Sequence, residues 1–101
     1  SEEMNEIFSS SELDQKARRL NVVQPRLTST LLRQTPATVV VIFIVDENGR
    51  VQDPKVQRTT NTAFDRSALA AIRQWKFEPA KAQGRPVSSR LRQSFSFENN
   101  N

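Results

Sequence analysis

The chain has 101 residues, a formal net charge of +4 at pH 7, and neither Cys nor His. This length allows one domain with one small core. Without Cys and His, disulfides, thiolate or imidazole metal sites and the common Ser-His-Asp or Cys-His catalytic groups are excluded, so we expect a non-enzymatic domain without a cofactor or metal.

The first 20 residues differ from the rest in charge. Five acidic residues and no basic one fall within residues 1–15, so removing their charge of −5 from the total of +4 leaves +9 on the remainder. Such a basic surface favours encounters with acidic partners of several kinds. Ile7, Phe8 and Leu13 are apolar enough to dock on a sheet. We expect residues 1–20 to be a partly ordered arm, residues 21–98 a folded domain and residues 99–101 a tail.

A short helix and a strong strand come next. Pro25 suits the first turn of a helix over residues 25–34, which Thr35-Pro36 ends. The run ATVVVIFIV at residues 37–45 is β-branched almost throughout and apolar on both parities. It therefore predicts a central strand that is covered on both faces.

The segment DENGR at residues 46–50 predicts a hairpin, because Asn-Gly supplies the positive φ values of tight turns. In the strand that follows, Val51 and Val56 have opposite parity, and Pro54 cannot donate a main-chain hydrogen bond. We therefore expect a shortened edge strand with a bulge near Asp53-Pro54.

A second helix is predicted from Asn61 or Thr62 to about Trp75, with Asp65 in its first turn, where a carboxylate suits the helix dipole. Its apolar stripe consists of Phe64, Ala68, Leu69, Ala71, Ile72 and Trp75. Pro79 prevents continuation of the helix, and Gly84 permits the turn into the last strand.

The last strand, residues 87–97, alternates between apolar and polar positions. One parity carries Val87, Leu91, Phe95 and Phe97, and the other carries Ser88, Arg90, Arg92, Ser94 and Ser96. One face of this strand is therefore expected to pack in the core and the other to face solvent. Because residues 37–45 alone are apolar on both faces, they lie in the middle. The expected fold class is α+β: a three-stranded antiparallel sheet in the order second, first, third, with two helices on one face.

This strand order leaves residues 87–97 as a long edge without an internal Pro or Gly. Unpaired main-chain groups on such an edge can accept an extended peptide by β-augmentation. On the solvent-facing side of this strand, only the charges of Arg90 and Arg92 oppose pairing with other chains. The alternative, of equal weight, is that the amino-terminal arm or a second copy of the chain covers it.

Three other chemical interpretations carry less weight. Asp46-Glu47-Asn48-Gly49 faintly resembles the start of a calcium loop, but it lacks the downstream Glu and fits a plain turn better. Trp75 with Phe77 could stack on bases, but aromatic residues at the end of an amphipathic helix are more often core. Arg90 and Arg92 are weak evidence for phosphate contacts, so nucleic acid is not an expected partner.

An ordered set of motifs resembles the carboxy-terminal domain of TonB-family energy transducers over roughly residues 24–98. The motifs are Val39-x-Val41-x-Phe43-x-Val45-Asp46, Asn48-Gly49-Arg50-Val51, Phe64-Asp65 with Ala68-Leu69-x-Ala71-Ile72, Trp75-Lys76-Phe77-Glu78-Pro79-Ala80 and Gly84-Arg85-Pro86-Val87. The Trp-x-Phe-x-Pro element followed by Gly-x-Pro-Val is the most specific part.

The resemblance implies a periplasmic domain of a protein anchored in the inner membrane of a Gram-negative bacterium. An ExbB/ExbD-type motor complex would act through the amino-terminal part of that protein. In this family, proton-motive-force energy reaches outer-membrane receptors when the receptor's TonB box pairs as an added strand with the domain's last strand. The sequence does not identify the receptor or the transported substrate.

The expected peptide-binding residues follow from the resemblance. They are Val87, Ser88, Ser89, Arg90, Leu91, Arg92, Gln93, Ser94 and Phe95 of the last strand, with Gln24 and Pro25 before the first helix. The latter two belong to Gln24-Pro25-Arg26-Leu27-Thr28, which lacks the Tyr and the second Pro of the family element. The alternative function is a structural module whose same edge forms a homodimer or whose surface contacts the cell wall.

Overall fold

The structure, a computed structural model, describes residues 7–8 and 13–99; expectations for the other residues of the amino-terminal arm and for the end of the tail lie outside the described residues. The elements in chain order are β1 (Ile7–Phe8), β2 (Arg18–Asn21), α1 (Ser29–Leu32), β3 (Ala37–Val45), β4 (Val51–Thr59), a 3₁₀ turn (Thr62–Phe64), α2 (Asp65–Ile72), β5 (Lys76–Glu78), β6 (Ala80–Ala82) and β7 (Arg85–Phe97). The expected order of helix, strand, strand, helix, strand is confirmed by α1, β3, β4, α2 and β7.

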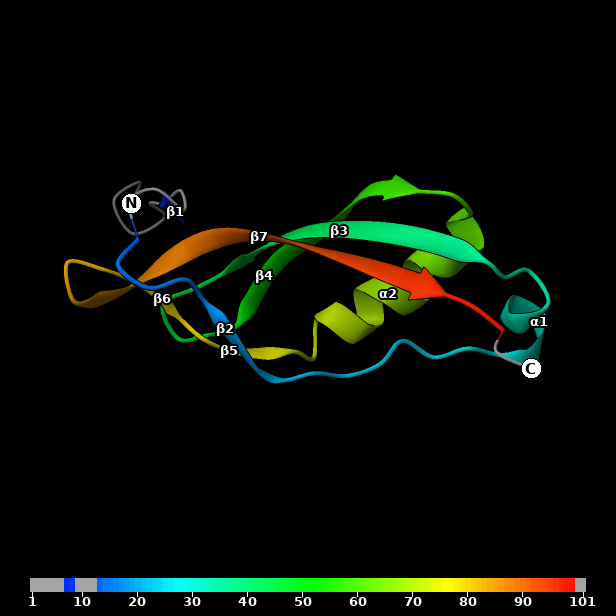
Figure 1. The fold of residues 1–101 in the computed structure, drawn as a ribbon, viewed down its shortest axis with the longest axis horizontal. Coiled ribbons are helices and arrows are strands. Elements are labelled where there is room, and N and C mark those ends of the chain that lie inside the picture. The colour runs from blue at the N-terminus through cyan, green and yellow to red at the C-terminus, as the bar shows by residue number, and fades with distance from the viewer. Residues whose placement is uncertain (1–6, 9–12, 100–101) are drawn as a thin grey trace.

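The main sheet has β3 at its centre, with β4 on one side and β7 on the other, both antiparallel to it. β7 pairs with β3 from Ala37↔Phe97 to Val45↔Ser89 without a register shift, and the two strands run side by side along the molecule (Figure 1). The α+β class and the strand order are therefore confirmed. The sequence did not indicate β1 and β6, which pair with β7, or the small separate sheet of β2 and β5.

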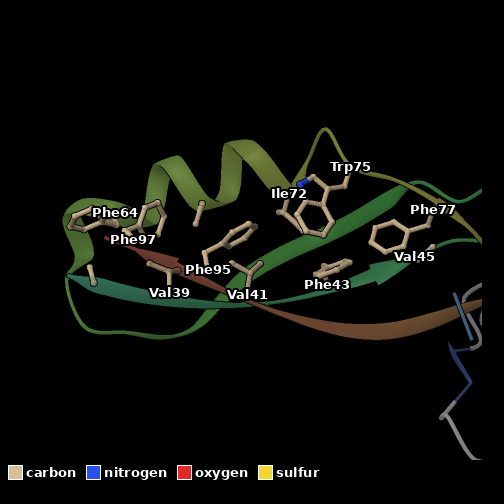
Figure 2. Close-up of a cluster of buried hydrophobic side chains, with 12 residues drawn as sticks. Val39, Val41, Phe43, Val45, Phe64, Ile72, Trp75, Phe77, Phe95 and Phe97 are labelled. Atoms are coloured by element: carbon tan, nitrogen blue, oxygen red, sulfur yellow. The ribbon is translucent and has the colours of Figure 1, made fainter. Parts of the chain in front are cut away.

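The core lies between α2 and one face of the main sheet, where the side chains labelled in Figure 2 meet. It is built from Ala37, Val39, Val41, Phe43, Val45, Phe64, Ala68, Ile72, Trp75, Phe77, Phe95 and Phe97. On the other face of β3, Val40 is buried, but Ile42 and Ile44 are only half-buried. The expectation that β3 is covered on both faces is therefore wrong at Ile42 and Ile44. Trp75 and Phe77 are each 3 % exposed, which confirms that they are core residues.

The β3–β4 turn depends on Gly49 for two separate reasons. Of the Asn48-Gly49 pair, only Gly49 has a positive φ, at 82°. Its carbonyl accepts a hydrogen bond of 2.9 Å from the N–H of Phe77, and a Cβ at Gly49 would lie 2.0 Å from the Phe77 carbonyl oxygen. The predicted hairpin is confirmed, and its tip also joins the chain around β5 to the sheet.

The acidic residue that opens this turn, Asp46, has a local structural role. Its carboxylate accepts hydrogen bonds of 2.9 Å from the backbone N–H groups of Asn48 and Arg50 and from the side-chain amide of Gln52. No group of acidic residues that could hold a metal ion occurs within the described part of the chain. These contacts fit the interpretation of the segment as a plain turn.

The bulge predicted near Asp53-Pro54 is confirmed. Ile42 pairs with Lys55 whereas Ile44 pairs with Gln52, so β4 has one extra residue between them, and Asp53 has a φ of 50°. The extra residue shifts the alternation, and both Val51 and Val56 therefore pack against the core. β4 has nine residues, so the expectation of a shortened strand is wrong; a second register shift lies between Val40 and Val41.

Both helices are shorter than expected. The Asn61 side chain accepts a hydrogen bond from the N–H of Ala63, as predicted for a cap. However, α2 ends at Ile72, and Trp75 follows in a turn in which its N–H donates to the carbonyl of Ile72 at 3.1 Å. α1 has only four residues, capped by Thr28, and lies at the end of the molecule toward which β7 runs (Figure 1). Pro25 lies before α1 in a segment that forms neither helix nor strand, because the φ that proline fixes suits such backbone as well as a first helical turn.

We predict that Gly49→Ala lowers the free energy of unfolding by more than about 2 kcal/mol, measured by urea denaturation. A left-handed conformation costs an L-residue about 1–2 kcal/mol, and the overlap with the Phe77 carbonyl adds to this cost. Gly84→Ala is the matched control: Gly84 has a φ of 77°, but nothing lies within 4 Å of the added Cβ. Equal losses in the two variants would contradict the role of the Phe77 contact.

The carboxylate of Asp46 predicts a pH dependence of stability. Burial opposes ionisation, but hydrogen bonds from Gln52, Arg50 and Asn48 outweigh it, so the pKa of Asp46 is lowered from its ordinary value. A lowered pKa stabilises the folded state above the unfolded value of about 3.9, and the benefit is lost as the pH falls through the folded value. The stability difference between the wild-type chain and Asp46→Asn should therefore be present at neutral pH and shrink below about pH 4. A difference that stays constant into strong acid would contradict this.

Candidate functional site

The outer edge of β7 is paired with β1 at its beginning and open further along. Ser88 and Ser89 pair with Ile7 and Phe8 of β1, and Val87 pairs with Ala80 of β6. From residue 90 to residue 97, no strand of the described residues pairs with this outer edge. Three of the residues expected to accept a peptide, Val87, Ser88 and Ser89, therefore already have a strand partner.

The strand alternation determines which main-chain groups of β7 point outward. The N–H of Thr60 donates to the carbonyl of Thr38 at 3.0 Å, so the even-numbered residues of β3 bond toward β4. The odd-numbered residues of β3 then bond toward β7, where their partners are also odd-numbered, as in Val41↔Gln93. The N–H and C=O groups that point away from the sheet belong to Arg90, Arg92, Ser94 and Ser96.

Two depressions lie along this open edge. One, of about 460 Å³, is lined by Ala17, Arg18, Arg19, Phe43, Phe77, Leu91, Arg92 and Gln93. The other, of about 330 Å³, is lined by Arg19, Val22, Gln24, Pro25, Leu27, Trp75, Gln93, Ser94, Phe95, Ser96, Phe97 and Glu98. Since Arg19 and Gln93 line both, we treat the two as one edge groove between β7 and residues 17–27.

The wall opposite β7 is held to the core by a few specific contacts. The indole Nε1 of Trp75 donates a hydrogen bond of 2.9 Å to the carbonyl of Val23. The guanidinium of Arg19 lies 6.0 Å from the centre of the Trp75 ring, within the range of a cation–π contact. The hydroxyl of Ser67 on α2 donates to the carbonyl of Arg26. Residues 22–28, which form neither helix nor strand, are thus fixed in position by their backbone carbonyls.

An ion pair fixes the start of the same wall. Arg18 of β2 bonds to Glu78 of β5, the one salt bridge found within the described residues. Mainly because Arg18 donates hydrogen bonds to its carboxylate, the pKa of Glu78 is lowered from its ordinary value. β2 is therefore held against β5 by side chains as well as by backbone pairing.

The groove is cationic at one end and mixed at the other. Arg18, Arg19 and Arg92 line the first depression, and Glu98 lies at the far end of the second. Val22 and Leu27, which are 41 % and 40 % exposed, add apolar surface. An open row of main-chain donors and acceptors beside cations and apolar side chains is suited to holding an extended peptide.

Several expected site residues come together, and others were missed. Gln24 and Pro25 line the same depression as Gln93, Ser94 and Phe95, although they lie far apart in the sequence. The residues missed in the opposite wall and floor are Arg18, Arg19, Val22, Leu27 and Trp75. Leu20 and Val22 lie two residues apart, as apolar residues on one face of a strand do, and this was the available sequence signal. The residue-level assignment stays a prediction.

The fold and the groove define a small α+β domain whose distinctive surface is an open sheet edge. The sequence profile described as "Gram-negative bacterial TonB protein C-terminal" matches residues 31–98, and the chain therefore belongs to this family. The family resemblance seen in the sequence motifs is confirmed.

Individual relatives agree with this membership. The chain is 35 % identical over 60 residues to Protein TonB of Xanthomonas campestris pv. campestris, in strain B100 and in strain ATCC 33913. That match covers 58 % of this chain and 27 % of the relatives, so the chain spans about a quarter of their length. The solution NMR structure of the Pseudomonas aeruginosa TonB CTD has the same fold, with a TM-score of 0.73, 24 % identity and coverage of 94 % of this chain and 96 % of the other. No helix of the described residues is long and apolar enough to cross a membrane.

We predict that Trp75→Phe loosens the groove wall more than it weakens the whole domain. Phe cannot donate to the Val23 carbonyl, and one such hydrogen bond contributes about 1 kcal/mol, or roughly fivefold in local opening. Tryptic cleavage after the exposed Arg26 should therefore be about fivefold faster than in the wild-type chain.

The matched control is Ile72→Val, which removes one buried methylene from the same core and leaves the hydrogen bond from Trp75 to Val23 in place. If Ile72→Val accelerates cleavage at Arg26 as much as Trp75→Phe does, cleavage follows general core loosening and the Trp75 bond does not hold the wall.

Proposed function

We propose that this chain is the periplasmic, non-enzymatic carboxy-terminal domain of a TonB-type energy transducer. It binds the TonB box of outer-membrane receptors by strand addition and transmits proton-motive-force energy from the inner membrane for substrate import. An ExbB/ExbD-type motor complex acts on the membrane-anchored, amino-terminal part of the whole protein. Membership of the TonB carboxy-terminal family and the open edge of β7 support this proposal.

The observation that carries the proposal is the row of outward main-chain groups within the edge groove. The outward N–H and C=O groups of Arg90, Arg92, Ser94 and Ser96 have no strand partner among the described residues, although the Ser94 carbonyl accepts a hydrogen bond of 2.9 Å from the side-chain amide of Gln93. An extended peptide can pair with this row of groups. These backbone bonds give affinity for any extended peptide, whereas the side chains around the groove select among peptides. Arg19 and Arg92 favour acidic residues in the box, whereas Arg18 is already paired with Glu78.

The altered Gln24-Pro25 element fits the same role. Both residues line the depression opposite Gln93, Ser94 and Phe95, so a peptide added to β7 contacts them. The family's Tyr and second Pro are replaced here by Leu27 and Thr28. Leu27 is 40 % exposed and presents an aliphatic surface instead of a phenol ring, which suits a box with an aliphatic residue at that point.

The alternative, a homodimer through the same edge, uses the same unpaired groups. In a register that pairs two antiparallel copies of β7 with Arg90 opposite Arg92, like charges lie directly across from each other, which is destabilising. An acidic peptide added to β7 avoids this repulsion between arginines. The homodimer is tested by sedimentation at several concentrations, and no feature of the described residues favours contact with the cell wall.

The test of the proposal is Ser94→Pro, which removes an outward N–H and places a ring on the groove side. Edge strands tolerate proline where the N–H faces away from the sheet, so the domain should stay folded. Affinity for box peptides from the receptors of the same genome should fall by about tenfold or more, as measured by chemical-shift titration. Ser94→Ala keeps the N–H and should bind like the wild-type chain.

Gln93→Pro is a control with the opposite expected outcome, because the N–H of Gln93 faces Val41 of β3 and not the groove. This variant should lose global stability, by about 3 kcal/mol or more, instead of losing peptide binding selectively. Wild-type binding by folded Ser94→Pro, or shift changes centred away from β7, would show that the edge is not the binding site.

A further inference from the structure

The face of the main sheet turned away from α2 carries an aliphatic stripe between two rows of cations. The stripe is formed by Val40, Ile42 and Ile44 of β3. Across from it, Arg90 and Arg92 of β7 pair with Ile44 and Ile42, and Lys55 and Arg58 of β4 pair with Ile42 and Val40. We name these seven residues the basic face. All four cationic side chains are exposed, whereas Ile42 and Ile44 are half-buried.

A depression of about 520 Å³ lies over the centre of the basic face. Its lining includes Ile42 and Ile44, with Lys55 and Asp53 from β4 and Arg90 and Arg92 from β7. The charges of these side chains sum to +2, from three cations and one carboxylate. No cation of the basic face forms an ion pair with a carboxylate of the described residues.

Solubility alone does not explain this composition. Further along the same face, β7 carries Ser94 and Ser96, which keep a strand wet without apolar surface or charge. At Ile42 and Ile44 the face instead has branched aliphatic side chains that are only half covered. Aliphatic surface flanked on both sides by unneutralised charge is the complement of a ligand that has apolar groups in the middle and carboxylates at its margins.

We propose that the basic face binds an acidic amphipathic helix of a partner protein. Neighbouring strands lie about 4.8 Å apart, so the two cationic rows are about 10 Å apart, close to the diameter of a helix. Along each strand, side chains on one face recur about every 6.7 Å, and positions i and i+4 of a helix recur about every 6 Å. Apolar residues of the helix rest on Ile42 and Ile44, and its flanking carboxylates meet Arg90 and Arg92 on one side and Lys55 and Arg58 on the other.

Other occupants match the face less well. A second copy of this chain, docked face to face, would place its four cations against the four cations of the first copy. A lipid surface is flat, whereas Ile42 and Ile44 lie at the floor of a depression between longer charged side chains. Nucleic acid would satisfy the cations and leave the aliphatic stripe without a partner. The helix uses side chains of the sheet face and not the outward main-chain groups of β7, so this inference does not depend on the proposed function. Of these side chains, Arg92 also lines the edge groove.

The experiment uses the whole chain and a synthetic helical peptide of about 16 residues, with a leucine stripe flanked on both sides by glutamates. Chemical-shift changes should centre on Ile42, Ile44 and Lys55, and binding should weaken as salt is raised. A peptide with lysine in place of glutamate should not bind. Ser94→Pro should bind the helical peptide like the wild-type chain, which separates this face from the edge groove.

Two variants test the face directly. The double variant Lys55→Glu, Arg58→Glu should bind the peptide at least about tenfold more weakly. Its matched control reverses the same number of charges by Arg66→Glu on α2 and Arg73→Glu at the residue that follows α2. It should bind nearly normally because α2 covers the opposite face. Ile44→Thr keeps a β-branched residue in the strand and should weaken binding by removing apolar contact.

The proposal is overturned if the shift changes lie elsewhere, or if both double variants lose affinity equally, because net charge alone would then explain binding. It is also overturned if the wild-type chain does not bind the peptide but binds phosphatidylglycerol vesicles or a random DNA duplex through the same residues. Concentration-dependent dimerisation that buries Ile42 and Ile44 would assign the face to self-association instead.

Discussion

The continuous antiparallel pairing of β3 with β7 is the constraint on which the rest of the structure depends. It places Phe95 and Phe97 on the same side as Val39 and Val41, where α2 and Trp75 complete the core. The same register turns the alternate main-chain groups of β7 outward and sets Arg90 and Arg92 beside Ile44 and Ile42. The core, the open edge and the basic face are therefore three results of one strand register, and a shift by one residue would change all of them.

The edge groove needs a second set of contacts that the sheet does not provide. Its outer wall, residues 17–27, is attached at separate points: Arg18 to Glu78, Val23 to Trp75 and Arg26 to Ser67. In two of these contacts a side chain of the folded domain donates to a carbonyl of the wall, which leaves the wall side chains free to line the groove. Trp75 therefore has two roles, since its ring packs edge-on against Phe95 while its N–H positions Val23.

The elements with strong local signals were predictable from the sequence. The β-branched run of β3, the Asn48-Gly49 turn, the bulge at Asp53-Pro54 and the alternation of β7 each depend on neighbouring residues. β1, β2, β5 and β6 were not predictable in this way: β2 is exposed at all four positions and is defined by pairing with β5, far away in the sequence. The open edge could be inferred because strand order follows from local patterns. The opposite wall of the groove could not, because the bond between Trp75 and Val23 that holds it joins residues 52 positions apart.

The direction of β7 has a mechanical consequence. Hydrogen bonds between strands lie nearly perpendicular to the strand axes. A pull on an added peptide along the axis of β7 would therefore shear all of its backbone bonds together, whereas a pull across the sheet would peel them one after another. A contact of modest equilibrium affinity on this edge can thus resist a brief load in one direction and still release readily in the other.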